Sequence, residues 1–241
     1  EFLQYQAAPT EKGYGILLAE AQRPDGYLAQ NVVGCILYNG YGMKRDPRSA
    51  IGYFYAAARH NNLAYGNYGL SLVQAGRGDG YPLMLKAFNK SGLEDLGVQL
   101  FMYQVKTGQV DPRLLNRLVA AKNSIGLYWQ ATELYRAKDY TRAIDIGLEA
   151  AERGERRAPA IVSNAYSQLF AVDGNPFSKE NSAVWSYIDQ LLNDPNRLAA
   201  RTKGSEADEL AYAKAKSWIS THKLNVKNYN EAICIPNGKT I

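Results

Sequence analysis

The apolar residues between Pro47 and Ala58 recur at the spacing of an α-helix. They fall at positions i, i+3, i+4, i+7 and i+8 of one face: Ala50, Tyr53, Phe54, Ala57 and Ala58. Asp46 and Pro47 stand at the start of this pattern. An Asp before a helix accepts hydrogen bonds from its first N–H groups, and Pro fits the first helical position. We therefore predict a helix that begins at Pro47.

A second predicted helix precedes this one and ends at Gly40, where Gly40 and Gly42 allow the positive φ of a helix-ending turn. Its opening residues return thirty-five positions later in the chain. The matched positions are small or apolar: Ala29 with Ala64, Gly34 with Gly69, and Leu37 with Leu72. A fixed period of this length is typical of stacked helix-pair repeats, in which each pair buries its apolar face against the next.

Weaker copies of the pattern continue to the end of the chain. Residues 124–153 read as a helix pair across a Lys138-Asp139 turn. A further pair is predicted near 158–171 and 178–193, with Trp185 as its core anchor. Residues 205–222 read as a terminal helix capped by Ser205.

The best-defined copy resembles the Sel-one-like repeat family, which is related to the tetratricopeptide repeat. The match covers about residues 29–75, and the departures are mild: Val33, Tyr53-Phe54 and Asn61. The resemblance implies an all-α, right-handed superhelical solenoid of antiparallel helix pairs that serves protein–protein interaction and carries no catalytic residues. We expect one solenoid domain over 1–241. Its expected parts are an N-terminal cap (1–28), Sel-one-like repeats (29–123), tetratricopeptide-like repeats (124–200), and a C-terminal capping helix with a tail (201–241).

Composition and charge favour a protein partner. The apolar fraction of 46% suffices for a folded core, and the apolar runs are too short to span a bilayer. The formal charge of +5 is modest, and basic residues are not interleaved with aromatic stacking motifs, so no nucleic-acid partner is predicted. The charge favours, mildly, an acidic partner surface.

Candidate chemistry is sparse. The two histidines, His60 and His222, stand at predicted helix ends and have no recognisable nucleophile context. We therefore expect that the protein is not an enzyme and needs no cofactor. We also expect no metal, because two cysteines without a CxxC motif cannot make a zinc site on their own. Cys35 and Cys234 leave two alternatives open, a disulfide that pins the tail or two separate thiols.

Partner-binding residues are predicted from the helix face opposite the repeat core, where such solenoids line a groove. The helical spacing places eight residues on this face: Asn31, Cys35, Tyr38, Leu70, Val73, Trp129, Glu133 and Arg136. Exposed aromatic and aliphatic side chains in a row suit a partner surface. The alternative is that the phase is shifted by one and these are ordinary core residues.

Three functional hypotheses remain. The first is a stoichiometric binder of one protein partner. Exported Sel-one-like proteins similar to this chain accompany phospholipase effectors of type VI secretion systems, which implies an immunity protein that inhibits a secreted lipase toxin. The second is an adaptor or chaperone in envelope assembly or signalling, and the third is a hydrolase on a helical scaffold. The chain starts at Glu1 without Met, which is compatible with a cleaved secretory leader and equally with a cloning junction. The resemblance favours an exported, periplasmic bacterial protein.

Overall fold

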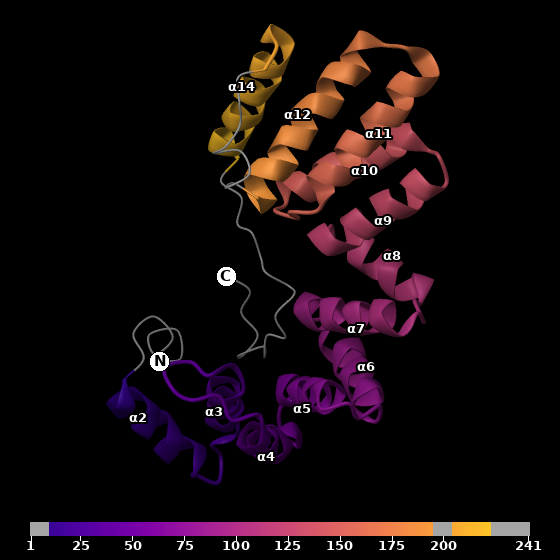
Figure 1. Ribbon diagram of the computed structural model, residues 1–241. Helices are drawn as coiled ribbons and strands as arrows, with labels where there is room; N and C mark the ends of the chain where they lie inside the picture. The colour runs from indigo at the N-terminus through magenta and orange to yellow at the C-terminus, as the bar shows by residue number, and fades with distance from the viewer. Residues whose placement is uncertain (1–9, 195–203, 223–241) are drawn as a thin grey trace. The chain divides into compact units, whose positions relative to one another are not determined.

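The computed structural model is all-α in the residues that it describes, which are 10–194 and 204–222 (Figure 1). Within them the chain forms twelve helices: α2 (Glu11–Ala21), α3 (Tyr27–Asn39), α4 (Pro47–Ala58), α5 (Asn62–Gln74), α6 (Gly80–Ser91), α7 (Glu94–Thr107), α8 (Pro112–Ala120), α9 (Ser124–Arg136), α10 (Tyr140–Glu152), α11 (Ala158–Asp173), α12 (Pro176–Asn193) and α14 (Glu206–Thr221). The predicted all-α fold is confirmed.

The helices pack in sequence order, in two compact units. Unit 1 contains α2 to α7, and unit 2 contains α8 to α14. In unit 1, α3 packs on α4 and α5 on α6, and α4 also contacts α5 and so joins the two pairs. In unit 2, α9 pairs with α10 and α11 with α12. Each repeat therefore supplies one helix pair, as predicted.

The predicted helix ends of the best-defined repeat are present. Gly40 follows α3 in the left-handed region with φ of 74°, and its N–H donates to the carbonyl of Ile36. Asp46 precedes α4, and its Oδ1 accepts from the backbone N–H of Ser49 at 3.1 Å. Pro47 is the first residue of α4. These local signals act within a few residues, so the sequence predicts them directly.

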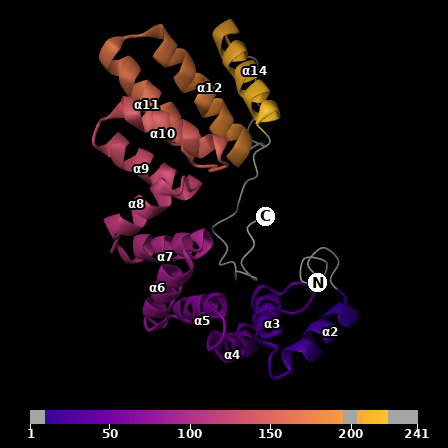
Figure 2. The same ribbon diagram turned by 180° about the vertical axis from the view of Figure 1, so that it is seen from behind.

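Two helix backbones cross closely in the α5–α6 pair. A Cβ atom added to Gly69 would lie 2.7 Å from the carbonyl oxygen of Gly80 and 2.8 Å from the amide nitrogen of Met84. Figure 2 shows α5 and α6 from behind. The crossing is possible because Gly69 and Gly80 have no side chains, and close packing of this kind leaves no space for added atoms.

The α3–α4 pair is closed differently, by an aromatic ring. Phe54 of α4 is 1% exposed and covers Gly34 of α3, where an added Cβ would lie 2.5 Å from its Cε1. The same ring lies 6.1 Å from that of Tyr38, measured between centroids. Phe54 thus fills the space that the missing Gly34 side chain leaves.

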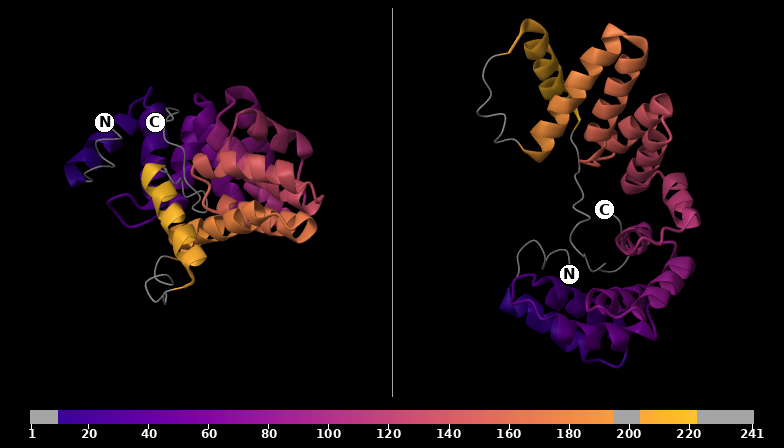
Figure 3. Two further views of the ribbon diagram at one scale, coloured as in Figure 1. Left: turned by 90° about the horizontal axis from the view of Figure 1, so that it is seen from above. Right: turned by 45° about the vertical axis from the view of Figure 1, so that its right-hand side comes forward.

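Unit 2 ends on an aromatic contact between two helices. Trp185 of α12 is buried, as predicted, and meets Trp218 of α14 edge to face with centroids 5.1 Å apart. The hydroxyl of Tyr187 donates to Oδ1 of Asp208 at 2.9 Å. Ser205 caps α14 by accepting from the N–H of Asp208, as predicted. Figure 3 shows α12 (orange) beside α14 (yellow).

Across the described ranges, no helix combines the length and the apolar character that crossing a bilayer requires. The expected boundaries of a single solenoid domain at 28, 123 and 200 stay a prediction.

Candidate functional site

An open groove of about 690 Å³ lies between α5 and α7 in unit 1. Both helices pack against α6. Its lining residues come from these two helices and from the turn after α5: Leu70, Val73, Gln74, Gly76, Arg77, Gly78, Gln99, Met102, Tyr103, Lys106 and Thr107. The volume is in the range of pockets that bind drug-sized ligands or a few side chains of a partner.

Each helix contributes one face to this groove. On α7 the lining residues Gln99, Met102, Tyr103 and Lys106 are spaced i, i+3, i+4 and i+7, and Leu70, Val73 and Gln74 follow the same spacing on α5. Leu70 is buried, whereas Val73 is half-buried. The groove therefore combines apolar side chains on both walls with amide groups that can bind a partner's backbone.

The turn after α5 places a cation in the groove. Gly76 adopts φ of 80°, a left-handed conformation that favours glycine, and the N–H of Arg77 returns to the carbonyl of Leu72 at 2.9 Å. This is the hydrogen-bond pattern of a glycine-terminated helix, and it fixes the backbone of Arg77.

The guanidinium of Arg77 is held by Asp79. Nε donates to Oδ1 at 3.2 Å and Nη2 to Oδ2 at 2.6 Å, which is a bidentate ion pair. Hydrogen bonding by Arg77 holds the pKa of the Asp79 carboxyl below its ordinary value, so both groups are charged at neutral pH. The repeat pattern places Asp79 before α6, but its side chain does not cap that helix.

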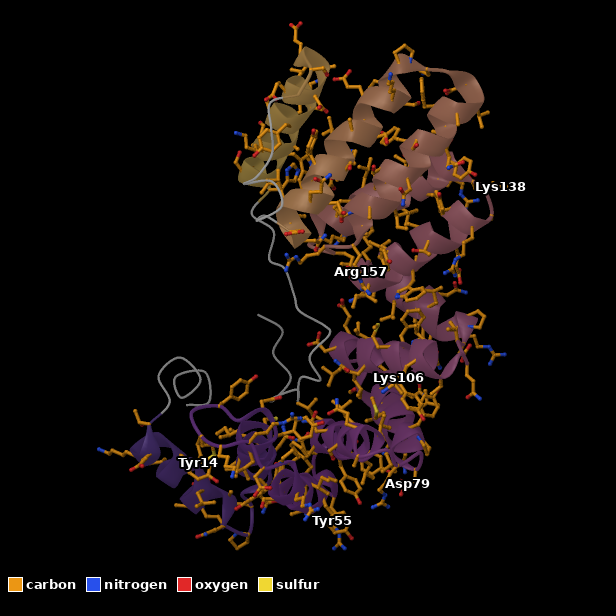
Figure 4. All side chains as sticks on the ribbon, viewed as in Figure 1. Tyr14, Tyr55, Asp79, Lys106, Lys138 and Arg157 are labelled. Carbon is orange, nitrogen blue, oxygen red and sulfur yellow. The ribbon has the colours of Figure 1, made fainter. Side chains whose placement is uncertain are left out.

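Lys106 supplies a second cation from α7. Its side chain is exposed, and among the described residues it forms no ion pair. Figure 4 labels Lys106 on α7 and Asp79 at the start of α6. None of the residues that line the groove carries a carboxylate, but Asp79 beside it offsets the charge of Arg77, so the net positive charge of the described wall is that of Lys106.

The aromatic wall of the groove is fixed by α6. The ring of Tyr103 stacks on that of Tyr81 with centroids 5.4 Å apart. Tyr81 itself accepts a hydrogen bond at its hydroxyl from Nε2 of the buried Gln104, at 2.8 Å. A side chain held in this way loses little conformational entropy when a partner binds.

Three of the predicted site residues on α3 are not exposed, which corrects the prediction. Asn31 and Cys35 are 0% exposed and Tyr38 is 3% exposed. Nδ2 of Asn67, on α5, donates to Oδ1 of Asn31 at 2.9 Å and approaches Sγ of Cys35 at 3.9 Å. Phe54 covers Tyr38. The predicted groove face of α3 is thus closed by contacts with α4 and α5, and burial raises the pKa of Tyr38.

The structure excludes one of the two alternatives for the cysteines, that of two separate thiols. Cys35 is disulfide-bonded, so it is not a separate thiol. Cys234 lies outside the described residues.

We expect Asn31→Ala to destabilise the protein rather than to weaken partner binding alone. The substitution leaves the buried amide of Asn67 without its bond to Asn31, which costs about 1–3 kcal/mol. The measurement is thermal unfolding followed by circular dichroism. Asn164→Ala is the matched control, because Asn164 is exposed in the middle of α11 and should change stability by less than about 0.5 kcal/mol. An unchanged melting temperature in Asn31→Ala would contradict this assignment.

Of the predicted residues on α5, Leu70 and Val73 both line the groove. Leu70 is 4% exposed, so the prediction of an exposed side chain is wrong for it, although it lines the groove. The opposite wall was not predicted. The signal that could have identified Met102 and Tyr103 is the same i, i+3, i+4, i+7 spacing from Gln99.

The other three predicted residues lie on α9, in unit 2. Glu133 and Arg136 are exposed, and Trp129 is half-buried with its ring edge-on to Tyr128 at 5.9 Å. They belong to a different unit from the groove, and their role in partner binding stays a prediction.

The described residues contain no cluster of three or more His, Cys, Asp or Glu side chains that could hold a metal ion. His60 lies just beyond α4 with its ring 5.6 Å from that of Tyr27. His222 follows α14, and its ring stacks on Trp218 at 4.2 Å. Both histidines therefore contact aromatic rings at helix ends.

No protein-family model and no curated protein matches the sequence. The fold is similar to that in the crystal structure of a Sel1 repeat protein from Oxalobacter formigenes, with a TM-score of 0.63 and 18% sequence identity. The likeness covers 92% of this chain and 99% of the other. At this identity the likeness concerns the fold, which is that of a Sel1-like scaffold of helix pairs.

Proposed function

We propose that this chain is a non-catalytic scaffold that binds one protein partner through the groove between α5 and α7. The observation that carries the proposal is the groove itself, with apolar residues on both walls and an aromatic side chain already held in place. Preformed concave sites of mixed apolar and polar character are the usual place of ligand or partner binding. The likeness of the fold to a Sel1 repeat protein supports a binding role, since such scaffolds present surfaces built from stacked helices.

A groove-filling variant tests this proposal. Val73→Trp should place an indole between the walls and abolish partner binding, because Val73 is half-buried in the lining. Ala56→Trp is the matched control, since Ala56 is exposed on α4 and outside the lining. The measurement is affinity capture from the native cell extract, followed by mass spectrometry. A partner that is captured equally by wild type, Val73→Trp and Ala56→Trp does not use the groove.

For the partner we propose a secreted phospholipase-type toxin, and for the chain the role of an exported, periplasmic immunity protein. The support is the resemblance of residues 29–75 to Sel-one-like repeats. Inhibition then requires only tight binding that covers the toxin's active site or substrate entrance.

The immunity role has a direct test. Purified chain, titrated against the phospholipase encoded beside its gene, should reduce lipid hydrolysis to zero at one equivalent, and its expression in the periplasm should protect cells from that toxin. If the adjacent gene encodes no toxin, or if hydrolysis is unchanged at excess chain, the adaptor hypothesis replaces the immunity hypothesis. The groove proposal is unaffected by that outcome.

A further inference from the structure

We infer that the α5–α7 groove selects an acidic segment of its partner, in which a carboxylate meets Arg77 and Lys106 and a neighbouring apolar side chain enters between Val73 and Met102. The inference rests on the proposed function, because it names the chemistry of the segment that the groove holds. It follows from how charge and apolar surface are distributed over the lining residues.

The charge of the lining has one sign. Arg77 and Lys106 are its ionised residues, one from each wall, and no described lining residue carries a carboxylate. The side chain of Arg77 is 59% exposed, so a partner can reach it, although Asp79 already offsets its charge. Two cations in one concave surface attract a carboxylate and repel a basic segment.

Asp79 leaves part of Arg77 available. It accepts from Nε and Nη2, and these two bonds orient the guanidinium plane. Nη1 makes no hydrogen bond to the described part of the chain and can donate to a partner's carboxylate. Asp79 is therefore a positioning residue, and it also lowers the positive charge that an approaching acidic segment meets.

The apolar part of the lining requires a second feature in the partner. Met102 is half-buried like Val73, and the buried Leu70 also lines the groove. Methionine adapts its shape to different apolar side chains, so this part favours an aliphatic or aromatic residue without fixing which one. Gln74 and Gln99 stand beside it with amide groups that suit the backbone of an extended segment.

The test is selection from a random library of 12-residue peptides against the full chain. We expect enrichment of sequences with Asp or Glu next to Leu, Ile, Met or Phe. Individual selected peptides should bind about tenfold or more weakly to Arg77→Glu/Lys106→Glu, because like charges then face each other. The same peptides should bind with unchanged affinity to the control Lys44→Glu/Arg48→Glu, whose positions are exposed and outside the lining.

The variant Asp79→Asn separates charge attraction from a structural effect. The amide side chain keeps one oxygen that can accept from Nε of Arg77, and a negative charge beside the groove is removed, so the variant should bind the acidic peptides at least as tightly as wild type at low salt. The gain should decrease as salt rises. All variants are first checked for an unchanged helical spectrum and melting temperature.

The outcomes distinguish this inference from the proposed function. Selected peptides that are apolar but neutral or basic, and that Val73→Trp still excludes, would overturn the acidic preference and leave the groove as the binding site. Peptides whose binding is unchanged in Val73→Trp would overturn both. Acidic enrichment that persists on the charge-reversed variant would also overturn the inference.

Discussion

Gly69→Ala is expected to destabilise unit 1 by about 3 kcal/mol or more, the upper end of the cost of overpacking a core. The added methyl group meets backbone atoms, the carbonyl oxygen of Gly80 at 2.7 Å and the amide nitrogen of Met84 at 2.8 Å. A backbone cannot change rotamer to make space, so α5 and α6 must move apart. Thermal or urea unfolding followed by circular dichroism measures the loss.

The matched control is the same substitution at an open position. Gly52 lies within α4, is exposed, and has no atom within 4 Å of an added Cβ. Gly52→Ala should therefore stabilise the protein by about 0.5–1 kcal/mol, the usual gain from removing a glycine inside a helix. Equal effects of the two substitutions would show that the α5–α6 crossing is not as close as described.

Phe54→Ala is expected to cost about 3–5 kcal/mol, because the fully buried ring leaves a cavity between α3 and α4. Adding Gly34→Ala should recover part of this loss. In the wild type the new methyl group would lie 2.5 Å from Cε1 of Phe54, whereas in the Phe54→Ala background that space is empty.

A double-mutant cycle measures the compensation. Gly34→Ala alone should destabilise, and the double variant should be more stable than the sum of the two single changes by about 0.5–3 kcal/mol, the range for residues in contact. Strict additivity would mean that Gly34 and Phe54 do not meet. No such compensation is expected at Gly69, since the two nearest atoms there, the carbonyl oxygen of Gly80 and the amide nitrogen of Met84, belong to the backbone.

The sequence predicted only part of the candidate site. The helical phase that we inferred from the repeat places Leu70 and Val73 on the groove side of α5, and both line the groove. The same phase fails on α3, because it assumes that the face opposite the repeat core stays open. Asn67 of α5 reaches that face and buries Asn31, although the two residues are thirty-six positions apart.

Asp79 stands where the sequence predicts a helix cap, but its carboxylate forms an ion pair instead. Its position before α6 matches that of Asp46 before α4. The carboxylate of Asp46 bonds to the N–H of Ser49, whereas that of Asp79 bonds to the guanidinium of Arg77. The competing donor is two residues away, and Gly76 fixes its backbone, so the ion pair replaces the cap.

The sequence by itself determined the all-α fold of this protein and the ends of several of its helices. Helix ends at Gly40, Pro47 and Ser205 depend on hydrogen bonds within three or four residues, and the repeat period predicts that consecutive helices pair. The tertiary structure decided which faces remain accessible. Burial of Tyr38, and the groove between Val73 and Met102, depend on how far apart non-consecutive helices lie. That spacing is set by side chains that pack across three helices. The pattern of apolar residues along a single helix does not predict it.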